Sequence, residues 1–338
     1  MVKKKTNKKS VKKTKTTKKS KPSVRKKIKK PSKAKLLPEV SRICQDIKNL
    51  EIQGARNVAI MGLSAYVIEG LGMQEKNTKT FLKHLKNTSN YIKSLRPTEP
   101  MLFNFLDSVE NKITKQKKVS DIKQTLYDSH RRFEELMRQN KIKISDHTLK
   151  YIKNGDIILT HCHSSTVVEA LIHAKTKGRK FKVFATETRP RWQGHKTVRN
   201  LANAGVDVTL IPDGAFASVM SLYNIKKVMV GSDAIDKNGN FANKVGSFAI
   251  ALVANHMKIP FYVLGESYKH DKRPKIIIEL RDPSEVVDPK FFKGVKILNL
   301  AFDMVPAKYV TTYITEKGPI SPKKYTPMAI KQIKHLLD

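Results

Sequence analysis

The stretch DIILT at residues 156–160, followed at once by HCHSS at residues 161–165, decides the fold of this chain. Its first half is an apolar run short enough for a buried strand, and its second half is a polar turn. An apolar-periodic segment from Thr166 to Lys177 then predicts a helix. A strand that enters a helix through a polar turn is half of a parallel α/β unit.

The same order of strand and polar turn recurs three times further along the chain. The predicted strands are residues 181–185, 206–211 and 227–230, and the polar turns after them are residues 186–190, 212–215 and 231–234. Ligands of parallel α/β sheets bind at the carboxyl ends of the strands. The turns therefore predict an active site at that end of the sheet.

Helical periodicity fills the sequence before this region. Two segments between Pro38 and Gly72 meet near Gly54, and the pattern continues through residues 81–95, 101–113 and 119–154. The sequence therefore predicts an α/β protein with two domains. An all-helical domain, residues 37–150, precedes an α/β domain with a mainly parallel sheet, residues 151–338.

Five segments in this order and spacing carry a family resemblance. They are THCHSS (160–165), ETRPRWQG (187–194), GSDAI (231–235), NGNFANKVGS (238–247) and GESYK (265–269). From about Leu37 onward the chain resembles the family that unites the alpha, beta and delta subunits of eukaryotic translation initiation factor 2B, methylthioribose-1-phosphate isomerase and archaeal ribose-1,5-bisphosphate isomerase. It resembles the last group most. The resemblance implies a Rossmann-like C-terminal domain and an active site in the cleft between the two domains.

Cys162 and Asp233 are the candidate catalytic residues. Cys162 ends a strand just before a helix whose N-terminal N–H groups would favour a thiolate, although free cysteine is commonly inert core filler. Asp233 ends another strand, where burial would raise its pKa and suit it to general acid catalysis; capping a turn is the alternative. The resemblance implies that these two residues form the catalytic pair, and Asp213 has a weaker claim.

Two histidines, His161 and His163, flank the cysteine. Because side chains alternate along a strand, we expect the histidines to point together and Cys162 to point away from them. A metal site is not predicted, since zinc would need a third and fourth ligand at suitable spacing. No GxGxxG motif follows a strand, so a dinucleotide cofactor is not predicted either.

The resemblance also implies a phosphate-binding pocket, because guanidinium groups and helix N-termini bind phosphate oxygens. The candidates at motif positions are Gln53, Gly54, Ala55, Arg56, Arg96, Ser164, Ser165, Arg189, Asn243, Lys244 and Lys269. For any one cation, plain surface charge is the alternative. Archaeal isomerases usually read Arg-Gly-Ala-Gly where this chain reads QGAR at residues 53–56, and they commonly have small apolar residues at the positions of Glu99 and Pro100.

The activity that the resemblance implies is the conversion of ribose 1,5-bisphosphate into ribulose 1,5-bisphosphate, an aldose–ketose isomerisation in AMP and nucleoside-monophosphate salvage. Cys162 would be the base and Asp233 the acid, with no cofactor. One alternative is a noncatalytic regulatory subunit, which the basic tail and Gln53 favour and the presence of both Cys162 and Asp233 disfavours. Another is methylthioribose-1-phosphate isomerase, whose substrate needs one phosphate site and an apolar slot. Family members assemble as dimers or hexamers, so a homo-oligomer is also implied.

A basic tail begins the chain. Residues 1–36 hold 18 of the 67 Lys and Arg and no Asp or Glu, in a chain of formal net charge +38. The tail is expected to be disordered and to contact nucleic acid nonspecifically, with a solubilising extension as the alternative. No apolar run approaches the roughly 20 residues that span a bilayer, and no secretory signal is recognisable. Two cysteines, Cys44 and Cys162, build no disulfide framework, so a cytoplasmic protein is expected.

Overall fold

The structure is a computed structural model that describes residues 36–292 and 294–336. The lysine-rich tail up to residue 35, with its expected disorder and its nucleic-acid contact, lies outside the described residues. Among the helices that are described, none is long and apolar enough to cross a membrane.

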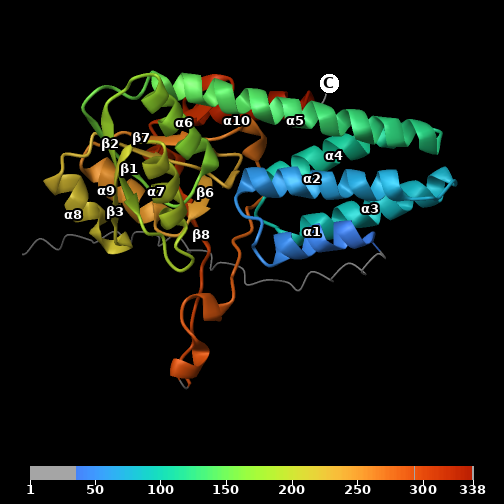
Figure 1. Cartoon of the computed structure of the whole chain (residues 1–338), viewed down its shortest axis with the longest axis horizontal. Coiled ribbons are helices and arrows are strands. Elements are labelled where there is room, and N and C mark those ends of the chain that lie inside the picture. The colour runs from blue at the N-terminus through green and yellow to red at the C-terminus, as the bar shows by residue number, and fades with distance from the viewer. Residues whose placement is uncertain (1–35, 293, 337–338) are drawn as a thin grey trace, which may run out of the picture. The chain divides into compact units, whose positions relative to one another are not determined.

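Five helices form the first part of the described chain (Figure 1). They are α1 (Pro38–Lys48), α2 (Ala55–Gly72), α3 (Thr78–Leu95), α4 (Pro100–Ile113) and α5 (Val119–Leu149). α2 is rich in apolar residues around its circumference and packs against each of the other four, as expected of a helix at the centre of a core. The helices predicted from periodicity are confirmed. α5 ends at Leu149 rather than Asn154, and Gly155, whose φ is 81°, opens the turn into the first strand.

A seven-stranded sheet forms the centre of the second part. Within the described residues its order is β10-β9-β7-β4-β1-β2-β3, and all neighbours are parallel except β9 and β10. The strands are β1 (Asp156–Thr160), β2 (Phe181–Thr186), β3 (Asp207–Ile211), β4 (Lys227–Val230), β7 (Phe261–Leu264), β9 (Thr312–Thr315) and β10 (Gly318–Ile320). The four strands predicted from the sequence and the mainly parallel sheet are confirmed.

Helices cover both faces of this sheet. The end of α5, α6 (Ser165–Thr176) and α7 (Gln193–Asn203) share a core with Ile158 and Met229 on one face. On the other face α8 (Phe216–Leu222), α9 (Ser247–His256) and α10 (Pro322–Lys334) share a core with Leu159 and Val228. Successive strand residues point to opposite faces, so burial on both faces requires the near-continuous apolar runs seen in the sequence.

The order of the strands changes direction between β1 and β4. The chain proceeds from β1 through β2 to β3 on one side, and from β4 through β7 to β9 on the other. In such sheets a crevice opens at this point, outside the carboxyl ends of the two central strands. Cys162 follows β1 and Asp233 follows β4, so the topology brings both candidates to the crevice.

A small antiparallel sheet and an arm complete the described chain. β5 (Ala234–Ile235), β6 (Phe241–Lys244) and β8 (Phe302–Val305) form the small sheet. Residues 275–300, here called the arm, run out from the body and return (orange in Figure 1), and an isolated bridge between Leu280 and Leu300 joins the two sides. The arm contains the short 3-10 turns Pro283–Glu285 and Pro289–Phe291. Periodicity in the sequence indicated neither the small sheet nor the arm.

Candidate active site

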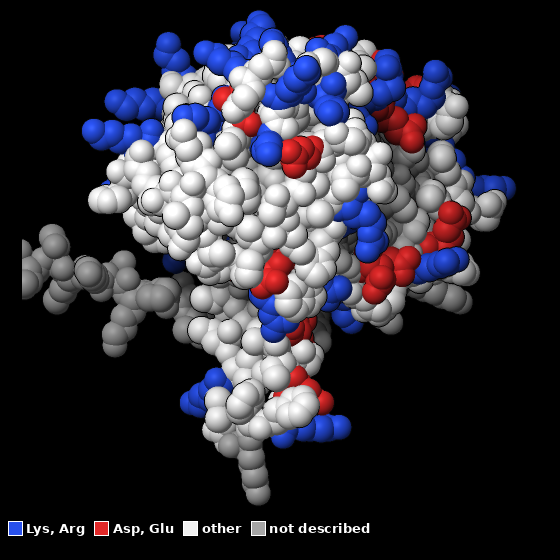
Figure 2. Space-filling model, turned by 60° about the vertical axis from the view of Figure 1, so that its left-hand side comes forward, with Lys and Arg blue, Asp and Glu red and all other residues white. Residues whose placement is uncertain are grey.

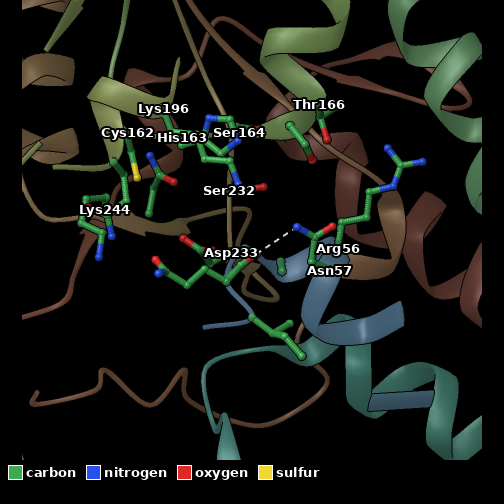
Figure 3. Close-up of a pocket in the computed structure, with 18 of the residues that line it drawn as sticks. Arg56, Asn57, Cys162, His163, Ser164, Thr166, Lys196, Ser232, Asp233 and Lys244 are labelled. Carbon is green, nitrogen blue, oxygen red and sulfur yellow. Dashed lines mark hydrogen bonds between the residues drawn. The ribbon is translucent and has the colours of Figure 1, made fainter. Parts of the chain in front are cut away.

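A pocket of about 470 Å³ lies at the ends of β1 and β4 (Figure 3). Its wall combines the first turn of α2, the turns after β1 and β4, the end of β6, and Arg281 from the outgoing side of the arm. Seven Lys or Arg and two acidic residues line it. The volume suits a small molecule, and the excess of cations favours an anionic one.

Cys162 sits half-buried in this wall with a left-handed backbone, φ 68°. Its N–H donates to Thr188 Oγ1 at 3.0 Å, and its carbonyl oxygen accepts from Thr197 Oγ1 at 2.9 Å. Thr188 is left-handed as well, with φ 63°. Such conformations cost roughly 1–3 kcal/mol each in residues other than glycine and gather at functional sites. The two hydrogen bonds hold the cysteine in this strained position.

The left-handed turn overturns the expected orientation of the histidines. His161 is buried outside the pocket lining, with Nδ1 2.6 Å from Thr186 Oγ1 and Nε2 2.9 Å from the carbonyl oxygen of Val245. His163 lines the pocket together with Cys162. The expectation that the two histidines point together is wrong, because the alternation of a strand stops where the backbone becomes left-handed.

Hydrogen bonds of Thr197 fix the tautomer of His163. The hydroxyl group of Thr197 donates its hydrogen to the carbonyl oxygen of Cys162. The hydroxyl oxygen of Thr197 therefore accepts a hydrogen bond from Nδ1–H of His163 at 3.0 Å. Burial, with a contribution from Lys196, lowers the pKa of His163 to about 4. The ring is therefore neutral at pH 7 and keeps Nε2 as an acceptor.

The thiol of Cys162 is protonated in this pocket. Burial raises its pKa to about 11; Lys244 and Arg281 act against this shift, and the charge of Asp233 adds to it. The expectation of a thiolate is thus wrong for the pocket without substrate. Desolvation of the sulfur outweighs the nearby cations and the start of α6.

Asp233 has a raised pKa, as expected, and burial is its main cause. Lys269, Lys244, Arg96 and Arg281 oppose the shift, in that order. The backbone N–H of Asp233 donates to the carbonyl oxygen of Ala242 at 2.9 Å and ties this turn to β6. Burial thus favours the protonated form of both candidate catalytic groups.

The weaker candidate Asp213 has a structural position instead. Its carboxylate accepts the backbone N–H groups of Thr188 and Arg189, each at 2.7 Å. It therefore holds the turn whose Thr188 side chain supports Cys162. The alternative of a capping role describes Asp213 and not Asp233.

Of the eleven predicted substrate-binding residues, ten line the pocket. They are Gln53, Gly54, Ala55, Arg56, Arg96, Ser164, Ser165, Asn243, Lys244 and Lys269. Arg189 is the exception: its guanidinium donates to the carbonyl oxygen of Val286 at 2.7 Å and lies over the Trp192 ring, 4.7 Å from the centroid. The turn after β2 directs Arg189 toward the arm, so its predicted place in the pocket is not found.

Arg56 lines the pocket, but its guanidinium group contacts residues outside the pocket lining. Nη1 lies 3.2 Å from Glu169 and Nε 3.8 Å from Glu266, and Nη2 donates to the carbonyl oxygen of Met137. The side chain extends away from the centre of the pocket (Figure 3). The first turn of α2, which begins after Gly54 at φ 83°, remains as a source of N–H donors for an anion.

Sequence reasoning missed several polar residues of the pocket: Arg191, Gln193, Lys196 and Arg281. The first three lie in or beside the segment ETRPRWQG, whose match to the family could have indicated them. Arg281 has no such signal. The outgoing side of the arm brings it into the wall, where Nε lies 3.6 Å from Glu279.

Several buried polar atoms around the pocket have no hydrogen-bond partner among the described residues. Nη1 of Arg96 and Oγ of Ser232 are two of them; Nε of Arg96 and Nε of Arg281 also lack a hydrogen bond, but they face Glu279 at 3.7 and 3.6 Å. An unpaired buried donor costs roughly 1–3 kcal/mol, which an anionic ligand would offset. Together with the cationic lining, these donors suit the pocket to an anionic ligand.

Comparison with known proteins identifies the family of this chain. The family described as Initiation factor 2 subunit family matches residues 51–322. The ribose 1,5-bisphosphate isomerase of Pyrococcus furiosus is 35% identical over 301 residues, which cover 86% of this chain and 92% of that protein. The 5-deoxyribose 1-phosphate isomerase of Petrotoga mobilis is 36% identical over 302 residues, which cover 83% and 87%. A crystal structure described as translation initiation factor eIF-2B of Pyrococcus horikoshii OT3 has a TM-score of 0.74 at 27% identity, covering 86% of this chain and 99% of that one. The chain therefore belongs to the Initiation factor 2 subunit family.

Proposed function

We propose that this chain converts ribose 1,5-bisphosphate into ribulose 1,5-bisphosphate. The coarser statement, that it is an enzyme that isomerises sugar phosphates, follows from its similarity to proteins named as such isomerases. The observation that carries the finer proposal is the distribution of cations in the pocket. A substrate with two phosphate groups needs two sets of donors.

Two such sets support the proposal. Arg96, Lys244, Lys269 and Arg281 line the pocket, and the positive charge of each opposes the raised pKa of Asp233. Lys196, which contributes to the lowered pKa of His163, also lines the pocket. Ser164 and Ser165, at the start of α6, line it as well. One set of four cations, and a second set that combines a helix N-terminus with a lysine, would provide donors for the two phosphate groups of a bisphosphate.

The isomerisation requires two proton transfers. One moves a proton from C2 to C1, and the other moves a proton from the C2 hydroxyl group to the former ring oxygen by way of Asp233. Asp233 donates a proton to the ring oxygen as the bond between this oxygen and C1 breaks. At the same time the thiolate form of Cys162, a minor form at neutral pH that Lys244 and Arg281 favour, takes the proton of C2. The product of this step is an enol with a C1–C2 double bond, which keeps the phosphate on C1. Cys162 then returns its proton to C1 while Asp233 takes the proton of the C2 hydroxyl, so both groups end as they began.

Cations of the pocket assist both steps. Lys244 and Arg281 lower the pKa of the Cys162 thiol, against the larger effect of burial. The same two side chains would stabilise negative charge that develops on the C2 oxygen. A buried amine contributes most in this way, and Lys244 is 5% exposed.

Turnover of ribose 1,5-bisphosphate by the purified chain tests the proposal, with ribulose 1,5-bisphosphate as the detected product. Cys162→Ser and Asp233→Asn should each lower kcat by about 10² or more, because each removes a proton relay. Glu135→Gln, on the exposed side of α5, is the matched control and should keep full activity. Absence of product from the wild type would contradict the proposal that ribose 1,5-bisphosphate is the substrate.

A second substrate, 5-deoxyribose 1-phosphate, is the alternative that a specific observation favours. Ile52, Ile60 and Met61 line the pocket and could receive a methyl group, and Gln53 brings no charge for a second phosphate. The ratio of kcat/KM for the two substrates decides between them. Methylthioribose 1-phosphate belongs in the same series, since its thiomethyl group needs the same apolar wall.

We also infer that copies of the chain associate through α8 and α9. Neither helix contains Asp, Glu, Lys or Arg, and Leu222 and Tyr223 at the end of α8 are 78% and 52% exposed. Figure 2 shows a broad uncharged face on the side of these helices. In a chain of net charge +38, two copies repel each other least through such a face.

Sedimentation equilibrium tests this association. Leu222→Asp should dissociate the oligomer, whereas Tyr127→Asp, at a 49% exposed position on α5, should leave it intact. A wild-type monomer at micromolar concentration, or equal effects of the two substitutions, would contradict the inference.

A further inference from the structure

Two carboxylates flank the guanidinium group of Arg96 behind the pocket. Glu99 Oε1 accepts from Nη2 at 2.7 Å, and Glu279 Oε1 lies 3.7 Å from Nε. The second oxygen of Glu279 lies 3.6 Å from Nε of Arg281. The side chains of Arg96 and Arg281 are only 4% and 9% exposed, so water screens these ion pairs weakly.

Glu279 is the carboxylate that contacts both arginines. Glu99 lies in the same turn as Arg96, whereas Arg281 reaches the pocket from the arm. One carboxylate between two guanidinium groups restrains both and leaves their remaining N–H donors for a ligand. Nη1 of Arg96 is such a donor, without a hydrogen-bond partner in the described part of the chain.

Backbone contacts hold Glu279 in this place. Thr98, two residues from Arg96, donates its hydroxyl hydrogen to the carbonyl oxygen of Ile277 at 2.7 Å. On the other side, the N–H of Ala301 donates to the carbonyl oxygen of Glu279 at 3.3 Å. The segment that carries Glu279 is thereby attached both to the turn of Arg96 and to the returning strand of the arm.

We propose that Glu279 is a positioning residue of the pocket, whose carboxylate holds Arg96 and Arg281 for one phosphate group of the substrate. The identity of that substrate rests on the proposed function, but the binding of a phosphate group does not. A purely electrostatic role is the competing explanation, in which Glu279 only balances the positive charge. The two roles predict opposite responses to removal of the charge.

Titration calorimetry with inorganic phosphate separates the two roles. Glu279→Asp keeps the charge but withdraws the carboxylate from both arginines, and Glu279→Gln keeps the shape but removes the charge. Positioning predicts that both variants weaken phosphate binding by about tenfold, the loss expected of one charge-assisted contact. Charge balance predicts unchanged binding for Glu279→Asp and tighter binding for Glu279→Gln, and either result overturns the proposal. Glu135→Gln, whose partner Arg138 is also exposed, is the control.

The unfolding midpoints of both variants show whether weaker phosphate binding comes from a general loss of structure. If Glu279→Asp unfolds early, the isosteric Glu279→Gln decides alone: weaker phosphate binding supports the proposal and tighter binding overturns it. With an active enzyme, positioning further predicts a raised KM with kcat nearly unchanged. If ribose 1,5-bisphosphate is not turned over, the proposed function fails while the phosphate titration still decides the role of Glu279.

Discussion

Cys162 and Asp233 follow β1 and β4, two strands that are neighbours in the sheet although β2 and β3 separate them in the sequence. Their proximity has an electrostatic consequence, since the charge of Asp233 raises the pKa of the Cys162 thiol. Loss of a proton from one group therefore opposes loss from the other. A pair that retains one proton between two sites is suited to moving protons on a sugar.

The reactivity of Cys162 should depend steeply on pH. Because its pKa is raised to about 11, the thiolate fraction below that pH rises about tenfold per unit. Labelling by iodoacetamide, followed by mass spectrometry between pH 7 and pH 10, should accelerate accordingly (about tenfold per unit). Lys244→Met should slow the labelling, since this cation favours the thiolate. A rate that does not change with pH would contradict the raised pKa, and Cys162→Ser measures the background from Cys44.

His163 should make the protein sensitive to acid. Burial lowers its pKa from 6.5 to about 4, so between these values the unfolded chain binds a proton that the folded chain does not. The stability from neutral His163 is complete above pH 6.5 and is lost as the pH falls toward 4. His163→Asn, whose amide can still hydrogen-bond to Thr197, should therefore lose less stability over this range than the wild type. Urea unfolding at pH 7, 5.5 and 4.5 measures the difference, and parallel curves would contradict the prediction.

Arg281 and Arg189 offer a matched pair of substitutions. Arg281 lines the pocket, whereas Arg189 contacts Val286 and Trp192 outside it. Arg281→Met should weaken binding of inorganic phosphate by about tenfold or more, as the loss of one charged hydrogen bond predicts. Arg189→Met should leave it unchanged. Equal effects of the two variants would show that general charge, and not position, governs the binding.

Gly231 should tolerate no side chain. A Cβ at this position would lie 2.6 Å from Oγ of Ser164, the residue that caps α6. Gly231→Ala should cost about 1–3 kcal/mol of stability through overpacking and should displace Ser164 from the pocket. Gly214→Ala is the control, since its Cβ would meet nothing within 4 Å. Thermal unfolding and phosphate titration of the two variants test this, and equal midpoints would refute the clash.

The basic tail should bind nucleic acid in a salt-dependent way. Residues 1–35 contain 18 Lys or Arg and no acidic residue. If these contact phosphates, the affinity for polyuridylate should fall steeply with salt, and a chain that starts at residue 36 should lose most of it. Filter binding at several salt concentrations measures both chains. Equal affinities would leave the solubilising role as the better explanation.

The sequence by itself determined the helices of the first part of the fold, the four strands from Asp156 to Val230 and, through the family resemblance, most of the pocket. Apolar periodicity depends on which faces of a helix or strand are buried, and a short stretch of sequence records it. The strands after Gly155 and the helices before it could be predicted for this reason. Ten of the eleven substrate-binding candidates, which the family resemblance supplied, line one pocket; of these, Ser164, Ser165 and Lys269 follow strands of the large sheet, as expected of turns that meet at one end of a parallel sheet.

Only the tertiary structure decided the state and the orientation of the groups in that pocket. The left-handed backbone of Cys162 separates His161 from His163, burial protonates the thiol, and ion pairs with Glu169 and Glu266 divert Arg56. The arm brings Arg281 and Glu279 to Arg96. Desolvation and Coulomb energies depend on distances between residues that are far apart in the chain, and local sequence patterns contain no such distances.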